Sequence, residues 1–232
     1  MDTVASHTPP DRTKLYKRAI VLAQITVFYN VIEGLVSVFF GLEDETLSLL
    51  GFGVDSFVEV ISGIGIWHMV QRMRRQPDGD PDPFERTALR VTGSAFYLLT
   101  LGLAGTAIVN LYRGHHPETT FWGIVVSLIS ILTMWVLIRF KMQVGVLLQS
   151  DAVIADAHCT RTCLYLSFVL LLASTGYALT GIGGLDSLGA LGIAVFAFRE
   201  GREAFQKARG KACACHACGG KAPKGDTGRS AA

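Results

Sequence analysis

The sequence predicts an all-α fold, a bundle of six transmembrane helices with no folded cytoplasmic domain. Half of its 232 residues are hydrophobic, and the apolar residues fall into six long runs. Each run is close to the ~20 residues that a helix needs to cross a bilayer. A soluble domain of this length would not contain six of them. The predicted spans are residues 19–40, 47–70, 91–111, 121–138, 152–179 and 185–198.

Polar segments flank this membrane domain, which we place at residues 19–205. Residues 1–18 form a short N-terminal segment with two prolines and several charges. They do not belong to a cleavable signal peptide, because the first apolar run is too long and lacks a small-residue cleavage site. Residues 206–232 are small, polar and rich in glycine, which predicts a disordered tail.

The positive charges are distributed unevenly between the two ends of the predicted helices. One end carries most of the Lys and Arg residues outside the tail: Arg12, Lys14, Lys17, Arg18, Arg72, Arg74, Arg75, Arg86, Arg90, Arg139 and Lys141. The other end has Arg113 and the acidic stretch Glu43, Asp44 and Glu45. Lys and Arg mark the cytoplasmic side, so we expect a multi-pass protein of the cell (inner) membrane with both termini cytoplasmic. The small net charge of +2 gives no indication of a nucleic-acid partner.

The first predicted helix has a polar face. Thr26, Asn30, Glu33 and Ser37 recur at the spacing of one helical face. A carboxylate in the middle of a span is a functional candidate by default, so Glu33 is a candidate for proton coupling. The alternative is a structural role, in which Glu33 pairs with a buried cation such as Arg161.

The second predicted helix carries a pair of carboxylates. Asp55 and Glu59 are four residues apart, so both side chains lie on the same helical face. Two carboxylates so close together in a membrane helix repel each other if both are ionised. They can share a proton, pair with a cation or bind a metal ion. The alternative is a purely structural pair.

The strongest signal lies in the fifth predicted helix, where polar groups interrupt an apolar run. Asp156, Cys159 and Cys163 fall within about 60° of one another on a helix. A carboxylate beside two thiols suits a divalent transition metal. The alternative is that the cysteines are small buried apolar residues. His158 and Arg161 lie off this face, and we expect Arg161 to pair with a carboxylate or to reach the interface.

The third and sixth predicted helices lack such a polar face. Gly102 and Gly105 in the third predict close helix packing, and Asp186 at the start of the sixth predicts an N-terminal cap. The fourth has a mild polar face that includes Ser127 and Ser130. We therefore expect the first, second, fourth and fifth helices to surround a polar pathway, with the third and sixth packed outside it.

The tail contains three thiols and an imidazole in a compact cluster: Cys213, Cys215, His216 and Cys218. Such a set could fill a tetrahedral Zn²⁺ site, which predicts a metal-capturing tail; the alternative is an incidental cysteine-rich end. No disulfide is expected, since the other two cysteines are intramembrane and the cytoplasm is reducing.

Two stretches resemble the second and fifth transmembrane helices of cation diffusion facilitators: residues 51–59, GFGVDSFVE, and residues 150–163, SDAVIADAHCTRTC. The resemblance spans about residues 15–205. It implies a six-helix, homodimeric antiporter that exchanges divalent cations for protons, with both termini cytoplasmic. On this alignment the four ligand positions of the family fall on Asp55, Glu59, Cys159 and Cys163.

The sequence departs from the family pattern in two ways. Typical members have H-x-x-x-D in the fifth helix, whereas Cys159 and Cys163 make this site softer. This softness favours Cd²⁺ or another thiophilic ion as cargo beside Zn²⁺; Co²⁺, Fe²⁺ and Mn²⁺ are further candidate ions. Typical members also carry a folded cytoplasmic domain after the last span, which residues 199–232 are too few and too polar to form.

We therefore expect a divalent transition-metal efflux transporter that is coupled to protons, works in the lipid bilayer as a homodimer and holds no permanent cofactor. The alternative is a membrane metal sensor or accessory subunit that transports nothing. An enzyme is not expected. The G-x-G-D motif of intramembrane aspartyl proteases is shifted by one residue, because Val54 stands between Gly53 and Asp55.

Overall fold

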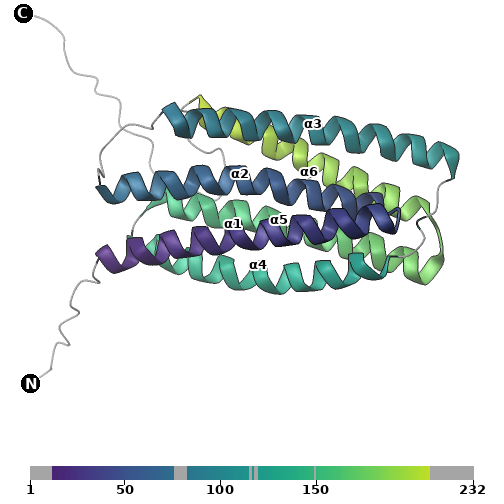
Figure 1. Ribbon diagram of the computed structural model, residues 1–232, viewed down its shortest axis with the longest axis horizontal. Helices are drawn as coiled ribbons and strands as arrows, with labels where there is room; N and C mark the ends of the chain where they lie inside the picture. The colour runs from purple at the N-terminus through teal and green to yellow at the C-terminus, as the bar shows by residue number, and fades with distance from the viewer. Residues whose placement is uncertain (1–11, 76–82, 115–116, 118–119, 149, 210–232) are drawn as a thin grey trace, which may run out of the picture.

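The computed structural model describes residues 12–75, 83–114, 117, 120–148 and 150–209; the predicted tail cluster at residues 213–218 lies outside them. Within these ranges the chain forms six helices and no strand (Figure 1). The helices are α1 (Arg12–Glu43), α2 (Leu47–Arg75), α3 (Pro83–Arg113), α4 (Phe121–Leu148), α5 (Asp151–Thr180) and α6 (Gly184–Ala208). The predicted all-α bundle of six helices is confirmed.

The helices have the length and the outer surface of membrane-spanning segments. The shortest, α6, has 25 residues, which at about 1.5 Å per residue exceeds the ~30 Å hydrocarbon core of a bilayer. Among the described helices, α1 to α5 are also apolar enough to cross a membrane. Large apolar side chains cover the outside, where Phe28, Leu98 and Leu172 are 68%, 70% and 73% exposed. Such a surface suits lipid rather than water.

Helix α4 corrects one predicted boundary. We placed the end of the fourth span at residue 138, because Arg139 and Lys141 suggested a cytoplasmic loop. The helix instead continues to Leu148, and α5 begins at Asp151. Arg139 is exposed, whereas the Lys141 side chain points inward and is only 1% exposed. Lys141 is therefore a buried residue within the helix and not part of a loop.

The first and last helices also extend beyond the predicted spans. Helix α1 begins at Arg12, so the end of the predicted N-terminal segment is helical, and α6 continues to Ala208. Charged residues such as Lys14 and Arg202 are exposed. They favour helix as strongly as many apolar residues do, so the helix does not end where the apolar run ends.

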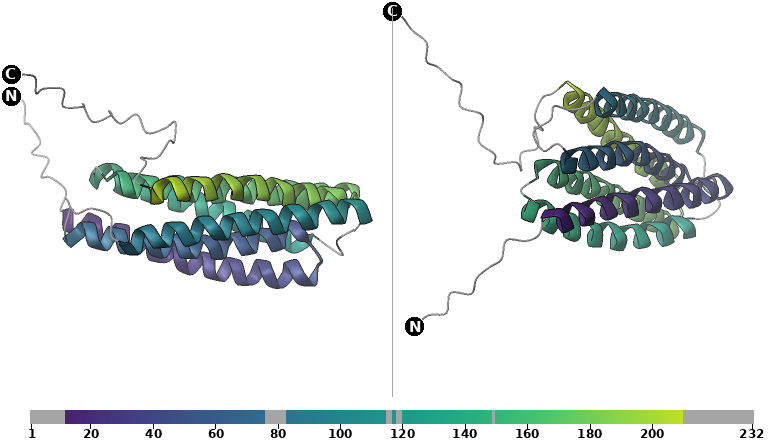
Figure 2. Two further views of the ribbon diagram at one scale, coloured as in Figure 1. Left: turned by 90° about the horizontal axis from the view of Figure 1, so that it is seen from above. Right: turned by 60° about the vertical axis from the view of Figure 1, so that its left-hand side comes forward.

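Four helices form the centre of the bundle and two lie outside it. Helix α1 packs along α2, α4 packs along α5, and contacts of α1 with α4 and of α2 with α5 close this group of four. Helices α3 and α6 pack along each other and rest against α2 and α5 (Figures 1 and 2). The predicted division into four inner polar helices and two outer ones is confirmed.

The two described ends of the chain lie at the same end of the bundle. Figure 1 shows α1 beginning where α6 finishes, with the helices running alternately up and down between them. The ends of α2 and α4 reach this end as well. It therefore gathers the Lys and Arg residues from which the cytoplasmic side was predicted.

Glycines let the backbones of three helix pairs come close together. A Cβ added to Gly53 of α2 would lie 2.8 Å from Val38 N of α1, and one added to Gly201 of α6 would lie 3.2 Å from Gly93 O of α3. Gly145 of α4 approaches the backbone of α5 in the same way. Because such contacts leave no room for a side chain, each pair is a closely fitted unit.

The glycines that were predicted to mediate packing in α3 do not do so within the chain. Gly102 and Gly105 are exposed, and a Cβ added to either would meet nothing within 4 Å. Small residues permit close approach without specifying which helix face meets a neighbour. The contact of α3 with α6 lies at Gly93 instead.

Asp186 links the start of α6 to the start of α2. We predicted a cap for α6, the helix to which Asp186 belongs. Its carboxylate instead accepts hydrogen bonds from the backbone N–H groups of Leu47 (2.8 Å) and Ser48 (3.1 Å), and from the Ser48 hydroxyl. These are the first residues of α2, so Asp186 caps a neighbouring helix. The residue type identified a cap correctly, but not which helix receives it.

Candidate metal centre

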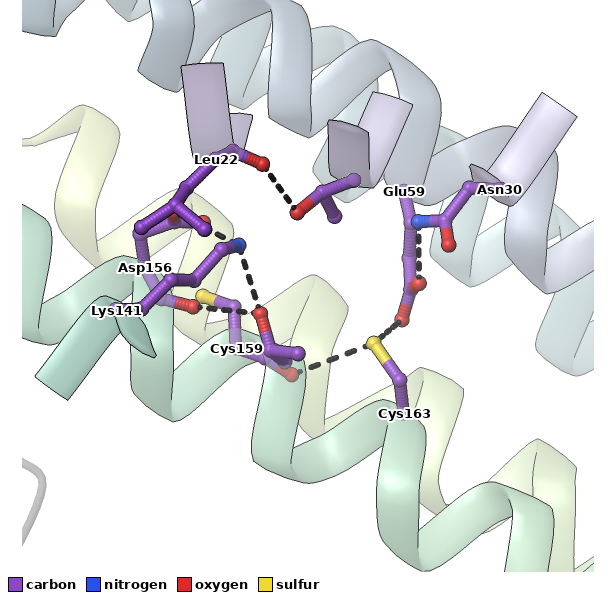
Figure 3. A network of polar contacts seen from close by, with 9 residues as sticks. Leu22, Asn30, Glu59, Lys141, Asp156, Cys159 and Cys163 are labelled. Carbon is purple, nitrogen blue, oxygen red and sulfur yellow. Dashed lines mark hydrogen bonds and ion pairs between the residues drawn. The ribbon is translucent and has the colours of Figure 1, made fainter. Parts of the chain in front are cut away.

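The carboxylate of Glu59 is the point at which α1, α2 and α5 meet. Its Oε2 atom accepts a hydrogen bond of 3.0 Å from Asn30 Nδ2 of α1. Its Oε1 atom accepts one of 2.5 Å from the thiol of Cys163 on α5. Asp55, one turn earlier on α2, is buried at 2% exposure. Figure 3 shows the contacts of Glu59 side by side, and they bring a carboxylate and a thiol from different helices together.

The two cysteines follow each other by one turn along α5. Cys163 is buried, and Cys159 is partly exposed. The thiol of Cys163 also lies 3.5 Å from the backbone carbonyl oxygen of Cys159. Figure 3 shows Cys159 between Cys163 and a second polar group that includes Asp156. Cys159 therefore lies on the side of the Glu59–Cys163 contact that is nearer to the start of α5.

Asp156 has a different partner from the other predicted ligands. Its Oδ2 atom lies 2.9 Å from Lys141 Nζ in a buried ion pair between α5 and α4. The ammonium also donates a hydrogen bond of 2.9 Å to Thr160 Oγ1, which in turn donates to the backbone oxygen of Asp156. The structure thus brings Glu59 and Cys163 into contact, whereas Asp156, on the other side of Cys159 (Figure 3), is held by a cation that the protein itself supplies.

Lys141 is the polar residue of this region that we did not single out from the sequence. It was counted as a loop charge, although the helical spacing of α4 could have identified it. The buried residues of α4 are Gly123, Val126, Ser127, Ser130, Met134, Leu137, Lys141, Val144, Gly145 and Leu148. Lys141 continues this inward face at steps of three and four residues. Periodicity was therefore a better guide than charge.

Glu33 lies on the inward face of α1 and is 6% exposed. Its two carboxylate oxygens accept hydrogen bonds from the hydroxyl groups of Tyr29 (2.9 Å) and Ser56 (3.0 Å). The structural alternative, a buried cation as the partner, pointed to Arg161. The partners found are instead hydroxyl groups, and Ser56 directly follows Asp55 in α2. Glu33 is therefore tied to the same segment of α2 as the paired carboxylates.

Carboxyl groups from neighbouring helices lie near the carboxyl pair of α2. The carboxylates of Glu33 and of Glu200, on α6, lie close enough to Asp55 and Glu59 for their charges to interact. Carboxyl groups from three helices are thus close enough to interact, and a buried carboxyl group that loses its proton attracts a cation strongly.

Among the described residues, two buried oxygen atoms near these carboxyl groups lack a hydrogen bond. They are Asp55 Oδ1 and Asn30 Oδ1, and a buried polar atom without a partner is costly. In this conformation no three His, Cys, Asp or Glu side chains of the described residues converge closely enough to hold a metal ion. The Glu59–Cys163 contact joins α2 to α5 and brings together two side chains of the types that bind metals, and the two oxygens without a hydrogen bond lie on α1 and α2.

Polar contacts continue between α4 and α5 beyond the cysteines. The hydroxyl groups of Ser130 and Ser167 lie 2.8 Å apart, and Ser167 also donates to the Cys163 carbonyl. Further along, the Thr120 hydroxyl donates to the carbonyl of Ser174 at 2.9 Å. The polar faces predicted for the fourth and fifth helices therefore meet each other and extend towards the far end of the bundle.

Comparison with known proteins agrees with this architecture. The model of the cation efflux transmembrane domain matches residues 23–209. A protein of Methanocaldococcus jannaschii, described only as an uncharacterized transporter, is 23% identical over 153 residues. That alignment covers 64% of this chain and 54% of the relative, so the chain spans about half the length of the relative it matches. Because the family model covers all six helices, apart from the first turns of α1, the chain belongs to the cation efflux family of membrane transporters.

Proposed function

We propose that this cation transporter exports divalent transition-metal ions, Zn²⁺ or a softer ion such as Cd²⁺, in exchange for protons. The single observation that carries the proposal is the contact of Cys163 with Glu59, 2.5 Å apart between α5 and α2. A thiol and a carboxylate are both ligands of Zn²⁺ and its softer neighbours. Helices from two sides of the polar centre supply them, as a pathway between helices requires.

The proposed ligands are Asp55, Glu59, Cys159 and Cys163. Two thiolates make this set softer than a site of imidazole and carboxylate groups, which favours thiophilic ions over hard ones. Asp156 is not included, although the sequence suggested it, because its carboxylate is engaged by the ammonium of Lys141. The burial of Asp55 and Cys163 supports a site that a metal reaches only after losing its water shell.

Coupling to protons follows from the chemistry of these ligands. A thiol and a carboxylic acid must each lose a proton before they bind a metal, so loading releases protons and unloading takes them up. In the exporter, metal enters from the cytoplasmic end, the helices move to open the other side, and protons return to the ligands. Glu33, hydrogen-bonded to Ser56 beside Asp55, is the proposed group through which protons leave or reach the centre.

The surroundings of the transporter follow from the sequence and the resemblance. We place the protein in the cell (inner) membrane with both termini in the cytoplasm, since the end of the bundle at which α1 begins and α6 finishes is rich in Lys and Arg. Two copies form the working dimer. The tail thiols and imidazole at Cys213, Cys215, His216 and Cys218 capture metal at low cytoplasmic concentration and deliver it to this end.

Purified protein in proteoliposomes tests the proposal. Uptake of Zn²⁺, Cd²⁺, Co²⁺, Fe²⁺ and Mn²⁺ is measured with and without a pH gradient, and the internal pH is recorded in the same vesicles. We expect metal flux with opposite proton movement, and loss of both in Glu59→Gln. Glu43→Gln, which alters an exposed carboxylate at the end of α1, is the matched control. Metal binding without flux would support the sensor or accessory subunit instead.

A further inference from the structure

The ammonium of Lys141 lies against the carboxylate of Asp156, at the place that a metal ion bound by this carboxylate would take. Its Nζ atom lies 2.9 Å from Asp156 Oδ2 and 2.9 Å from Thr160 Oγ1. The Lys141 side chain is 1% exposed, whereas that of Asp156 is 12% exposed. The pair lies next to Cys159 (Figure 3). Both side chains of the pair are thus buried, that of Lys141 the more completely.

Without that ammonium, Asp156 would be a fitting metal ligand. It lies three residues before Cys159, and Asp156, Cys159 and Cys163 fall within about 60° of one another on α5. Adding a carboxylate to two thiols and the α2 carboxylates would raise the share of hard oxygen ligands. A larger oxygen share shifts preference from soft ions such as Cd²⁺ towards harder ones such as Mn²⁺.

We propose that Lys141 is a specificity-determining residue: a tethered cation that withholds Asp156 from the metal and so keeps the site soft. This inference rests on the proposed metal transport and names what sets its selectivity. The charge of Lys141 is fixed in place by the helix, so it does not leave when a metal arrives. The metal meets two thiols and the carboxylates of α2, but not a third carboxylate from α5.

A merely structural ion pair would tie α4 to α5 and affect all metals alike. The two roles therefore differ in one measurable quantity, the ratio of affinities for a soft and a hard ion. Removing the ammonium should change that ratio if Lys141 withholds a ligand. It should change stability or total binding, at constant ratio, if Lys141 only joins two helices.

The test compares Lys141→Met, which keeps the apolar stem without the charge, with the double variant Lys141→Met/Asp156→Asn. Arg139→Met, which removes an exposed cation from the same helix, is the matched control. Binding of Cd²⁺ and Mn²⁺ is measured on each detergent-purified protein, and their flux is measured in proteoliposomes. The metal ions alone are the probes.

We expect Lys141→Met to lower the Cd²⁺ to Mn²⁺ affinity ratio by about tenfold, which corresponds to about 1.4 kcal/mol. The double variant should return to the wild-type ratio, because the freed carboxylate is gone. The control should match wild type. An unchanged ratio in Lys141→Met that still binds Cd²⁺ would overturn the inference.

Lys141→Gln, whose uncharged amide can still donate a hydrogen bond to Thr160, is the second variant if Lys141→Met does not fold. A lowered Cd²⁺ to Mn²⁺ ratio in Lys141→Gln supports the inference, because Asp156 is then free to bind the metal. A wild-type ratio in Lys141→Gln would overturn it. Failure of the proposed function is distinct: wild-type protein would bind metals in detergent and move none of them in vesicles.

Discussion

Cys163 of α5 and Glu59 of α2 are 104 residues apart in the chain, yet the thiol lies 2.5 Å from the carboxylate oxygen. Asn30 of α1 holds the other oxygen of the same carboxylate. Glu59 thus joins α1, α2 and α5 at the centre of the bundle. Substitutions at the residues around it test the proposed role of this contact.

Loss of the Cys163 thiol should weaken metal binding. Because a change in an outer partner of a metal ligand costs about 10–100-fold in affinity, Cys163→Ala should reduce Cd²⁺ affinity at least about tenfold, and Cys163→Ser somewhat less. Equilibrium dialysis with purified protein measures this. Ser167→Ala, one turn further along the same face of α5, is the control and should retain nearly all binding. Equal losses in both variants would assign the effect to helix packing.

Exchange of both cysteines tests the softness of the site. Cys159→His with Cys163→Asp keeps the spacing of four residues and replaces thiolates with harder ligands. The variant should still transport Zn²⁺ but lose relative preference for Cd²⁺. Measuring both ions in one vesicle preparation corrects for differences in folding and yield. If Zn²⁺ flux persists at an unchanged ratio of the two ions, the cysteines do not bind the metal.

Glu33 should matter for protons more than for the metal. Its carboxyl group is held by Tyr29 and Ser56, and the carboxyl groups of Asp55 and Glu59 are close enough to interact with it. Glu33→Gln should therefore flatten the dependence of flux on pH while changing metal affinity by less than about threefold, because the amide retains hydrogen bonds but carries no charge. Flux is measured across a series of pH gradients. Tyr29→Phe, which keeps the carboxylate, is expected to preserve the pH profile, and an unaltered profile in Glu33→Gln would remove Glu33 from the proton route.

Asp186 should contribute stability without contributing to metal selectivity. Asp186→Asn retains the shape but removes the charge that holds the first N–H groups of α2, and hydrogen bonds to charged groups are worth about 1.5–3 kcal/mol. Thermal unfolding in detergent should occur at a lower temperature, with unchanged relative affinities for Zn²⁺ and Cd²⁺. Ser48→Ala, which removes only one of the three donors, should have a smaller effect. The cap would be unimportant if both variants unfolded like wild type.

Removal of residues 211–232 should affect metal capture alone. The deletion leaves all six helices and every proposed ligand of the centre in place. Maximal flux should therefore be unchanged, while flux at low metal concentration should fall. A variant with serine in place of Cys213, Cys215 and Cys218 separates the thiols from the length of the tail. Wild-type flux at every concentration would make the cluster incidental.

The sequence predicted those features that depend on spacing along one helix. The pairing of Asp55 with Glu59, and of Cys159 with Cys163, followed from steps of four residues. The inner position of four helices followed from their polar faces. The sequence did not predict which side chain of another helix contacts each polar residue. Contacts such as Lys141–Asp156 depend on how the helices are placed relative to one another in the fold. Charge was taken as a sign of exposure at Lys141, and this was wrong because a buried charge is stable when it has a partner such as Asp156.

The glycine contacts divide the inner helices into two closely fitted units, α1 with α2 and α4 with α5. Glu59 belongs to the first unit and Cys163 to the second, so the two proposed ligands lie on opposing units. Metal–ligand distances tolerate deviations of only about 0.2 Å. A small sliding of one helix pair past the other is then enough to lower the affinity for the metal steeply, although the ligands themselves are chemically unchanged. The affinity for the transported ion then depends on how the two helix pairs are aligned, and this alignment changes when the helices of a transporter move.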